Sequence, residues 1–193
     1  MVIGLTGGTG TGKSLISEFF AQNGFEVIDY DKVTREVYAP GSECLEEITK
    51  AFGKDILNAD GTLNRRMLGS IVFSDSEKLA LLNKTVYKYI LASTDEKINN
   101  SKDKKLLLDA PTLFDAGLEE KCDYVVGVIA DKDLRLKRIM ARDGIDSVHA
   151  QNRINSQKSD EFFRENCDFI IENNTDKDHV RTCVNNILKS IKD

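Results

Sequence analysis

The chain has 193 residues, of which 40% are hydrophobic and 31% are charged. A chain of this length and composition forms one globular domain with a sizeable core, so wholesale disorder is excluded. Lys and Arg total 27 against 32 for Asp and Glu, which gives a net charge of -5 at pH 7. This balance argues against a general nucleic-acid-binding protein but allows a local basic pocket for a small anion.

Membrane, secreted and metal-scaffold classes are also disfavoured. The apolar stretches are far shorter than a membrane span, and Met1 leads directly into an apolar run without a basic leader. The four cysteines are far apart and form no C-x-x-C pair; they are Cys44, Cys122, Cys167 and Cys183. His149 and His179 lack ligand-like spacing. We therefore expect a cytoplasmic protein with reduced thiols and no membrane partner.

Short apolar runs alternate with amphipathic segments, which predicts an α/β fold with a parallel sheet covered by helices. The predicted strands are rich in Val, Ile and Leu, as expected for strands buried on both faces. They cover residues 2–6, 25–28, 105–109, 124–130 and 169–172. One helix is predicted from about Gly12 to Gln22, and another follows the apolar periodicity between Val180 and Ile191.

The segment between the second and third predicted strands contains no convincing strand and is much longer than a simple crossover. It predicts a helical insertion at about residues 32–104 of a single domain that spans 1–193. Pro40-Gly41 and Asp60-Gly61 mark turns within it. A later apolar stripe predicts a long helix that ends near Asn99.

Residues 7–14, Gly-Gly-Thr-Gly-Thr-Gly-Lys-Ser, match the phosphate-loop pattern G-x-x-x-x-G-K-[ST] between a predicted strand and a predicted helix. Glycines let successive backbone amides point at phosphates, and the helix adds its unpaired N-terminal amides. Lys13 would place a charge against the β- and γ-phosphates, and the Ser14 hydroxyl would bind Mg²⁺. The alternative is a glycine-rich turn that only links strand to helix. The context favours nucleoside triphosphate binding.

Other features narrow the class of nucleotide-binding protein. GTPases usually carry an N-K-x-D segment, and Asn83-Lys84-Thr85-Val86 lacks its aspartate. The short chain, the helical insertion and an arginine-bearing segment near Arg142 favour a small-molecule kinase that closes over both substrates.

Three aspartates follow predicted strands at their C-terminal ends, where parallel sheets bind ligands. Asp29 and Asp31 follow the second strand, where a carboxylate would orient or deprotonate an acceptor hydroxyl. Helix capping is the alternative, equally open for Asp29 and less so for Asp31. Asp109 ends the third strand and would face Mg²⁺ or its water shell, unless it only forms a turn.

Arg135, Arg138 and Arg142 are spaced to share one face of a predicted helix, with Ile139 and its apolar neighbours on another. Three cations on one side would clamp a polyphosphate, and the alternative is a solvated cationic face. A second helix, from about residue 147, brings Arg153. We expect residues of about 132–165 to form a helical lid.

An ordered series of segments carries a family resemblance over nearly the whole chain. These segments are residues 3–14, 27–31, 40–42, 51–53, 60–66, 109–117, 140–144, 153–157 and 169–174. The segment DAPTLFDAG at 109–117 is similar to a family pattern D-x-P-L-L-F-E-x-G, and residues 173–174 are paired asparagines. Together they resemble the dephospho-coenzyme A kinase family, whose fold is a three-layer P-loop kinase.

The resemblance implies transfer of the ATP γ-phosphoryl group to the ribose 3′-hydroxyl of dephospho-CoA. Asp31 would be the base, Lys13 and Arg142 would stabilise charge, and Ser14 would bind Mg²⁺, with Asp109 acting through water. The residues implied for ATP are Gly7, Gly8, Thr9, Gly10, Thr11, Gly12, Lys13, Ser14, Leu15, Arg138, Arg142 and Asn173. Those implied for dephospho-CoA are Asp31, Asp109, Leu113, Phe114, Gly117 and Arg153, with the helical insertion. A monomer is expected.

Three positions depart from the family pattern. Leu15 stands where threonine is usual, but Ser14 still supplies the magnesium hydroxyl. Tyr87-Lys88 replaces a common His-Pro, which removes a proline-induced bend from the long helix. Asp115 replaces glutamate, which keeps the charge and shortens its reach.

Two other functions stay open on the sequence alone. One is a kinase of the same fold that acts on a nucleoside monophosphate or another small metabolite. The other is a regulator that binds ATP without transferring its phosphate. The presence of Asp31 and Arg142 argues against the regulator.

Overall fold

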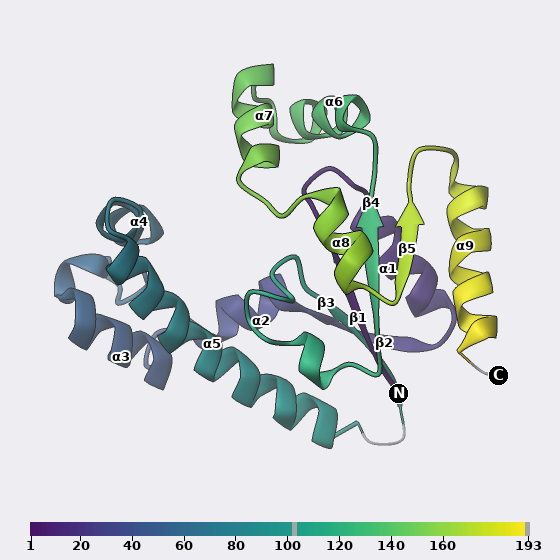
Figure 1. The fold of residues 1–193 in the computed structure, drawn as a ribbon. Helices are drawn as coiled ribbons and strands as arrows, with labels where there is room; N and C mark the ends of the chain where they lie inside the picture. Colours follow the sequence, from purple (N-terminus) through teal and green to yellow (C-terminus); the bar gives the residue numbers. More distant parts are fainter. Residues whose placement is uncertain (102–103, 192–193) are drawn as a thin grey trace. The chain divides into compact units, whose positions relative to one another are not determined.

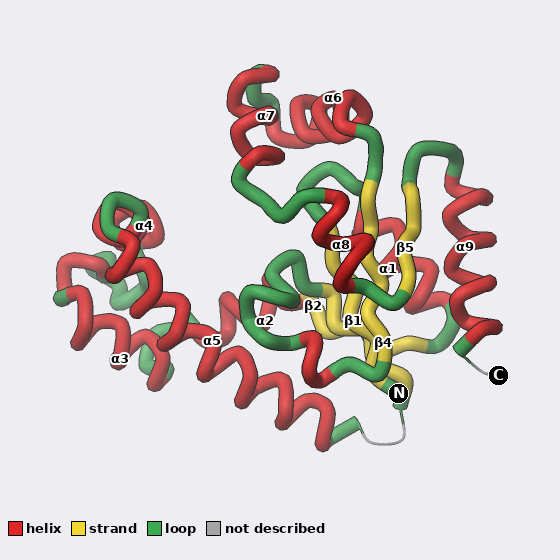
Figure 2. Tube along the Cα trace, in the orientation of Figure 1, coloured by secondary structure: helices red, strands yellow, loops and turns green. Residues whose placement is uncertain are grey.

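A computed structural model describes residues 1–101 and 104–191. These residues form two compact units, one of residues 1–28 with 104–191 and one of residues 29–101. Figure 1 follows the chain through its elements, and Figure 2 separates helices, strands and loops.

The first unit is built on a five-stranded sheet of order β2-β3-β1-β4-β5. Its strands are β1 (Val2–Gly7), β2 (Phe25–Asp29), β3 (Lys105–Asp109), β4 (Tyr124–Ile129) and β5 (Phe169–Glu172). β1 pairs in parallel with β3 and β4, and β4 pairs in parallel with β5. The predicted α/β fold with a parallel sheet is confirmed. The strand ends differ from the predicted ones by at most one residue.

Helices α1 (Lys13–Gln22), α8 (Asp160–Asn166) and α9 (Lys177–Ser190) cover the faces of this sheet. The unit also contains α6 (Lys132–Asp143), α7 (Ser147–Asn155) and a 3₁₀ turn η2 (Glu119–Lys121), and in Figure 1 α6 and α7 lie beyond the C-terminal ends of the strands. α1 and α9 pack together and bury a core with Leu5 and Val126 of the sheet and Phe20 and Val184 of the helices. In Figure 1, α1 lies behind the sheet and α8 lies in front of it. Burial of this apolar surface is the main term that stabilises the unit.

The second unit is helical. It contains α2 (Tyr30–Val37), α3 (Glu43–Phe52), η1 (Lys54–Ile56), α4 (Arg65–Val72) and α5 (Ser76–Asn99). α5 contacts α2, α3 and α4 and buries Leu82, Val86 and Ile90. It runs without interruption through Tyr87-Lys88, as expected where a proline is missing. Within residues 1–101 and 104–191, no helix combines the length and apolar character needed to cross a bilayer.

Candidate functional site

The loop between β1 and α1 closes into a tight turn. The backbone N–H and the hydroxyl of Thr11 both donate to the Gly8 carbonyl, with distances of 3.3 and 2.8 Å. Gly12 has φ +86°, in the left-handed region that favours glycine, and directly precedes the first residue of α1. The first-turn amides of α1 therefore follow the loop without a break, which suits an anion.

Side chains from distant segments bind the carbonyl groups of this loop. Arg138 Nη1 donates to the Gly10 and Thr11 carbonyls, each at 3.3 Å. Asn173 Nδ2 donates to the Thr11 carbonyl at 2.8 Å, and Arg138 Nη2 donates to the Asn173 carbonyl at 3.1 Å. These side chains bind carbonyl groups of the loop, whereas phosphates are bound by loop amides, so the two sets of contacts do not compete. The structure thus brings together Arg138, Asn173 and the loop.

α6 packs against the same loop through Arg135 and Ile139. Arg135 is buried and donates from Nε to the Thr9 carbonyl at 3.0 Å. Ile139 is fully buried, and its side chain lies against Gly10. The expectation that Ile139 lies on another face of the helix than Arg135 is wrong. Residues four apart in a helix share a face, so Ile139 lies beside Arg135.

Arg142 and Arg153 meet at one carboxylate beside the loop. Arg142 Nη2 donates to the Thr9 hydroxyl at 3.3 Å, and its Nε donates to Asp143 Oδ1 at 2.7 Å. Arg153 on α7 pairs with Asp143 Oδ2. The hydrogen bond from Arg142, together with the charges of both arginines, lowers the pKa of Asp143. The same carboxylate raises the pKa of Arg142.

Lys13 and Asp109 form an ion pair between the start of α1 and the end of β3. Their side chains are 16% and 14% exposed, so the pair is largely shielded from water. Ser14, the next residue of α1, is exposed. Within the described parts of the chain, no three or more His, Cys, Asp or Glu side chains are grouped as a metal-binding cluster.

In the second unit, Asp29 caps α2. Its Oδ1 accepts hydrogen bonds from the backbone amides of Asp31 and Lys32, at 2.9 and 3.3 Å. The capping alternative for Asp29 is therefore the one found. The side chain of Asp31 is exposed in the first turn of α2.

A cavity of about 460 Å³ adjoins the phosphate loop. Its lining residues are Gly7, Gly8, Pro111, Thr112, Phe114, Asp115, Ser156, Gln157, Lys158 and Phe163. Asp115 pairs with Lys158 Nζ at 3.1 Å, and the same ammonium lies 4.4 Å from the ring centre of Phe162. The cavity therefore offers an aromatic wall and a charged pair beside the glycines.

Two of the residues expected to contact the acceptor do not line this cavity. Leu113 is fully buried and packs against Gly4 of β1. Its apolar side chain fills the core under the loop that follows β3. Gly117 has φ +67° and supplies a turn of that loop. Phe114, the third such residue, does line the cavity.

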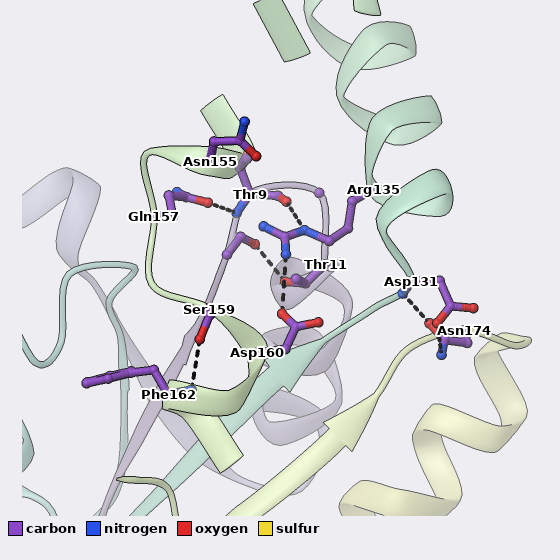
Figure 3. Close-up of polar contacts among 12 residues, drawn as sticks. Thr9, Thr11, Asp131, Arg135, Asn155, Gln157, Ser159, Asp160, Phe162 and Asn174 are labelled. Atoms are coloured by element: carbon purple, nitrogen blue, oxygen red, sulfur yellow. Dashed lines mark hydrogen bonds and ion pairs between the residues drawn. The ribbon is translucent and has the colours of Figure 1, made fainter. Parts of the chain in front are cut away.

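Sequence reasoning missed two contacts made by the segment after α7. Gln157 Oε1 accepts a hydrogen bond from the Thr9 amide at 2.7 Å, and Asp160 pairs with Arg135 (Figure 3). Gln157 and Thr9 are 148 positions apart. No local pattern marks such a contact, since it depends on how α6 and α8 pack around the loop.

Comparison with known proteins decides the family. A family model for dephospho-CoA kinase matches residues 1–179. The chain belongs to the dephospho-CoA kinase family. The dephospho-CoA kinase of Corynebacterium efficiens is 37% identical over 192 residues, which cover 98% of this chain and 96% of that protein.

Solved structures agree with this membership of the dephospho-CoA kinase family. The dephospho-CoA kinase structure from Campylobacter jejuni is 28% identical, with a TM-score of 0.71 and coverage of 98% of this chain and 96% of that one. A crystal structure from Thermus thermophilus is 26% identical, with a TM-score of 0.86 and coverage of 99% and 97%. The resemblance seen in the sequence and the predicted P-loop kinase fold are both confirmed.

Proposed function

We propose that the chain transfers the γ-phosphoryl group of ATP to the ribose 3′-hydroxyl of dephospho-CoA, giving CoA and ADP, the last step of CoA biosynthesis. The observation that carries this proposal is the phosphate loop, whose carbonyls are bound by Arg135, Arg138 and Asn173. Such a loop supports a polyphosphate donor, and the family match over residues 1–179 supports the acceptor.

On the donor side, Lys13 would exchange the carboxylate of Asp109 for the phosphates. Its ammonium follows the loop directly and is paired with a single carboxylate. A compact, mobile point charge of this kind suits the changing geometry of a transferring phosphoryl group. The ammonium would stay paired with an anion in both states.

We assign Mg²⁺ to Ser14, with Asp109 acting through a water. Both residues offer oxygen atoms, which Mg²⁺ prefers, and Mg²⁺ usually keeps several of its waters. One direct protein ligand is therefore enough, because waters complete the coordination of Mg²⁺ and no larger cluster of side chains is needed. When bound, Mg²⁺ would neutralise negative charge on the β- and γ-phosphoryl oxygens.

Asp31 is proposed as the base that accepts the proton of the 3′-hydroxyl. Two observations support this choice over its neighbour. The carboxylate of Asp29 is already bound by backbone amides as a helix cap, whereas the side chain of Asp31 is exposed. A positioned base contributes about 10²- to 10⁴-fold to such reactions.

Arg142 is proposed to stabilise charge on the transferring group as part of a lid at about residues 132–165. It now touches the loop through the Thr9 hydroxyl and shares Asp143 with Arg153. Turning from Asp143 to a phosphoryl oxygen would keep the guanidinium paired with an anion while it gains the transition-state charge.

For the acceptor, the cavity beside the loop is proposed to receive part of dephospho-CoA. Phe114 and Phe163 give it an apolar wall, and Lys158 offers a cation. This mixture suits a ligand with both apolar and anionic parts. Gly117, Arg153 and the helical unit of residues 29–101 remain proposed contributors to the same substrate.

We further propose that the enzyme is a cytoplasmic monomer. The four cysteines are free thiols in the structure, which suits a reducing compartment. Light scattering on the purified protein should give the mass of one chain, and a dimer mass would contradict the proposal.

The direct test is ADP release from Mg-ATP with dephospho-CoA and, separately, with AMP, CMP, UMP or shikimate. ADP that forms only with dephospho-CoA and matches the CoA produced is the expected result. Turnover on another acceptor alone would overturn the substrate. Tight ATP binding without turnover on any acceptor would indicate a regulator.

A further inference from the structure

Arg135 stands between the phosphate loop and the start of α8. Its side chain is 6% exposed. Nε donates to the Thr9 carbonyl at 3.0 Å, and Nη1 pairs with Asp160 Oδ1 at 3.3 Å. Figure 3 shows the guanidinium between these two partners, with its remaining nitrogen turned toward the side of Thr9 and Gln157.

That remaining nitrogen, Nη2, is buried and has no hydrogen-bond partner among the described residues. A charged donor that is buried without an acceptor opposes folding, because it loses its water and gains nothing in exchange. The same burial lowers the pKa of Arg135, an effect that the charge of Asp160 only partly offsets. Such an unpaired group in a folded protein calls for a functional explanation.

The position of Nη2 identifies the kind of acceptor that can reach it. A side-chain carbon added at Gly8 would collide with Nη2, so this nitrogen lies directly against the backbone of the phosphate loop. The same added carbon would lie 3.2 Å from Gln157 Oε1. Gly8 and Gln157 both line the cavity of about 460 Å³. An acceptor that enters the loop from this cavity would therefore come close to Nη2.

Gln157 already shows where an oxygen is bound at this end of the loop. Its Oε1 accepts a hydrogen bond of 2.7 Å from the Thr9 amide, one of the loop amides. A phosphoryl oxygen carries more negative charge than an amide oxygen and accepts stronger hydrogen bonds. It would displace Gln157 from that amide.

We propose that Arg135 is a nucleotide-binding residue, whose Nη2 donates to one oxygen of a β- or γ-phosphoryl group of ATP while another oxygen of that group replaces Gln157 Oε1 at the Thr9 amide. The inference rests on the proposed function only in taking ATP as the ligand. Nε and Nη1 hold the guanidinium in place through Thr9 and Asp160, and Nη2 makes the contact with the phosphate. Lys13 and Arg142 would then not be the only cations on the polyphosphate.

The test is calorimetric titration of ATP, ADP and AMP into wild type and Arg135→Lys, with EDTA present so that metal binding does not enter. Lysine keeps the charge, but its single ammonium cannot donate hydrogen bonds to Thr9, Asp160 and a phosphate at the same time. We expect the affinity for ATP and ADP to fall about 10- to 100-fold, as for loss of one charge-assisted hydrogen bond. The affinity for AMP, which lacks the β- and γ-phosphoryl groups, should stay unchanged.

Asp160→Asn is the matched control, because the asparagine amide oxygen can still accept the hydrogen bond from Nη1 that positions the guanidinium, while the negative charge is lost. If Nη2 binds phosphate, this variant keeps or gains ATP affinity. If Arg135 only fastens the loop to α8, both variants lose affinity for all three nucleotides, and the proposal is overturned. Unchanged ATP affinity in Arg135→Lys would overturn it as well. Thermal unfolding of each variant shows whether it folds, and Arg135→Met provides an apolar replacement that should lose ATP and ADP affinity as Arg135→Lys does.

These titrations need no acceptor substrate. Failure of the wild type to phosphorylate dephospho-CoA would overturn the proposed function, while the nucleotide-binding result for Arg135 would stand. The two failures are therefore distinguishable.

Discussion

Asn173 and Thr11 are 162 positions apart in the sequence and are joined by a hydrogen bond of 2.8 Å from Asn173 Nδ2 to the Thr11 carbonyl. Asn173 is 3% exposed and directly follows β5, so the bond fixes the phosphate loop to the far edge of the sheet. This buried hydrogen bond contributes more to stability than a surface hydrogen bond, because water cannot reach the carbonyl to replace a lost donor.

Replacement of Asn173 by alanine should therefore weaken the loop. We expect a loss of about 0.5–1.5 kcal/mol in the free energy of unfolding and weaker ATP binding, because the buried Thr11 carbonyl loses the shorter of its two side-chain hydrogen bonds and keeps only the one from Arg138. Asn185→Ala, at an exposed position of α9, is the matched control and should change neither quantity. Urea unfolding and ATP titration of both variants measure the effect. Equal behaviour of the two variants would show that the bond is unimportant.

Gly12→Ala should combine two penalties. Gly12 has φ +86°, and a side-chain carbon there would collide with Asn173 Nδ2. Gly24 has a similar φ of +84° but nothing within 4 Å of such a carbon. Gly24→Ala should therefore show only the backbone cost of about 1–2 kcal/mol, whereas Gly12→Ala should lose more stability and also ATP affinity. If both variants bind ATP as wild type does, the contact with Asn173 does not shape the loop.

Asp31→Asn should bind ATP almost normally and lose about 10²- to 10⁴-fold in kcat, because the amide cannot accept the hydroxyl proton. Asp29→Asn is the neighbouring control. Asparagine caps a helix as well as aspartate does, so α2 should keep its N-terminal cap and its stability. Steady-state kinetics with dephospho-CoA separate the two. Near-wild-type turnover in Asp31→Asn would exclude this residue as the base.

Stability should fall at alkaline pH through Cys122. Burial, followed by the nearby charges of Glu119 and Asp123, raises its pKa to about 12. In the unfolded chain a cysteine has a pKa of about 8.5, so the unfolded state releases its proton first. The stabilisation is complete below the unfolded pKa and is lost as the pH rises toward the folded pKa.

Between pH 7.5 and 10, the wild type should therefore lose up to about 2 kcal/mol more unfolding free energy than Cys122→Ala. Urea unfolding of both proteins at the two pH values measures this difference. An identical pH dependence would contradict the assignment to Cys122.

Much of this architecture could be predicted from local sequence. The strands are short apolar runs, and the motif at residues 7–14 lies between the first strand and the helix that follows it. Glycines, helix caps and periodic apolar side chains determine the backbone within a few residues, so their effect can be predicted from the local sequence. The same local reasoning located α5 and its end at Asn99.

The roles of Arg135, Ile139 and Leu113 were decided only by tertiary structure. Arg135 looked equivalent to Arg138 and Arg142, but packing of α6 on the loop buried it and left its Nη2 without a partner in the described part of the chain. Leu113 looked like a loop residue near a ligand, but the chain turns after β3 and places it against Gly4. The sequence by itself determined the nucleotide motif and the order of elements, because both depend on short-range backbone preferences. Only the tertiary structure decided which side chains reach the loop, because those contacts join segments more than 100 positions apart and depend on close packing.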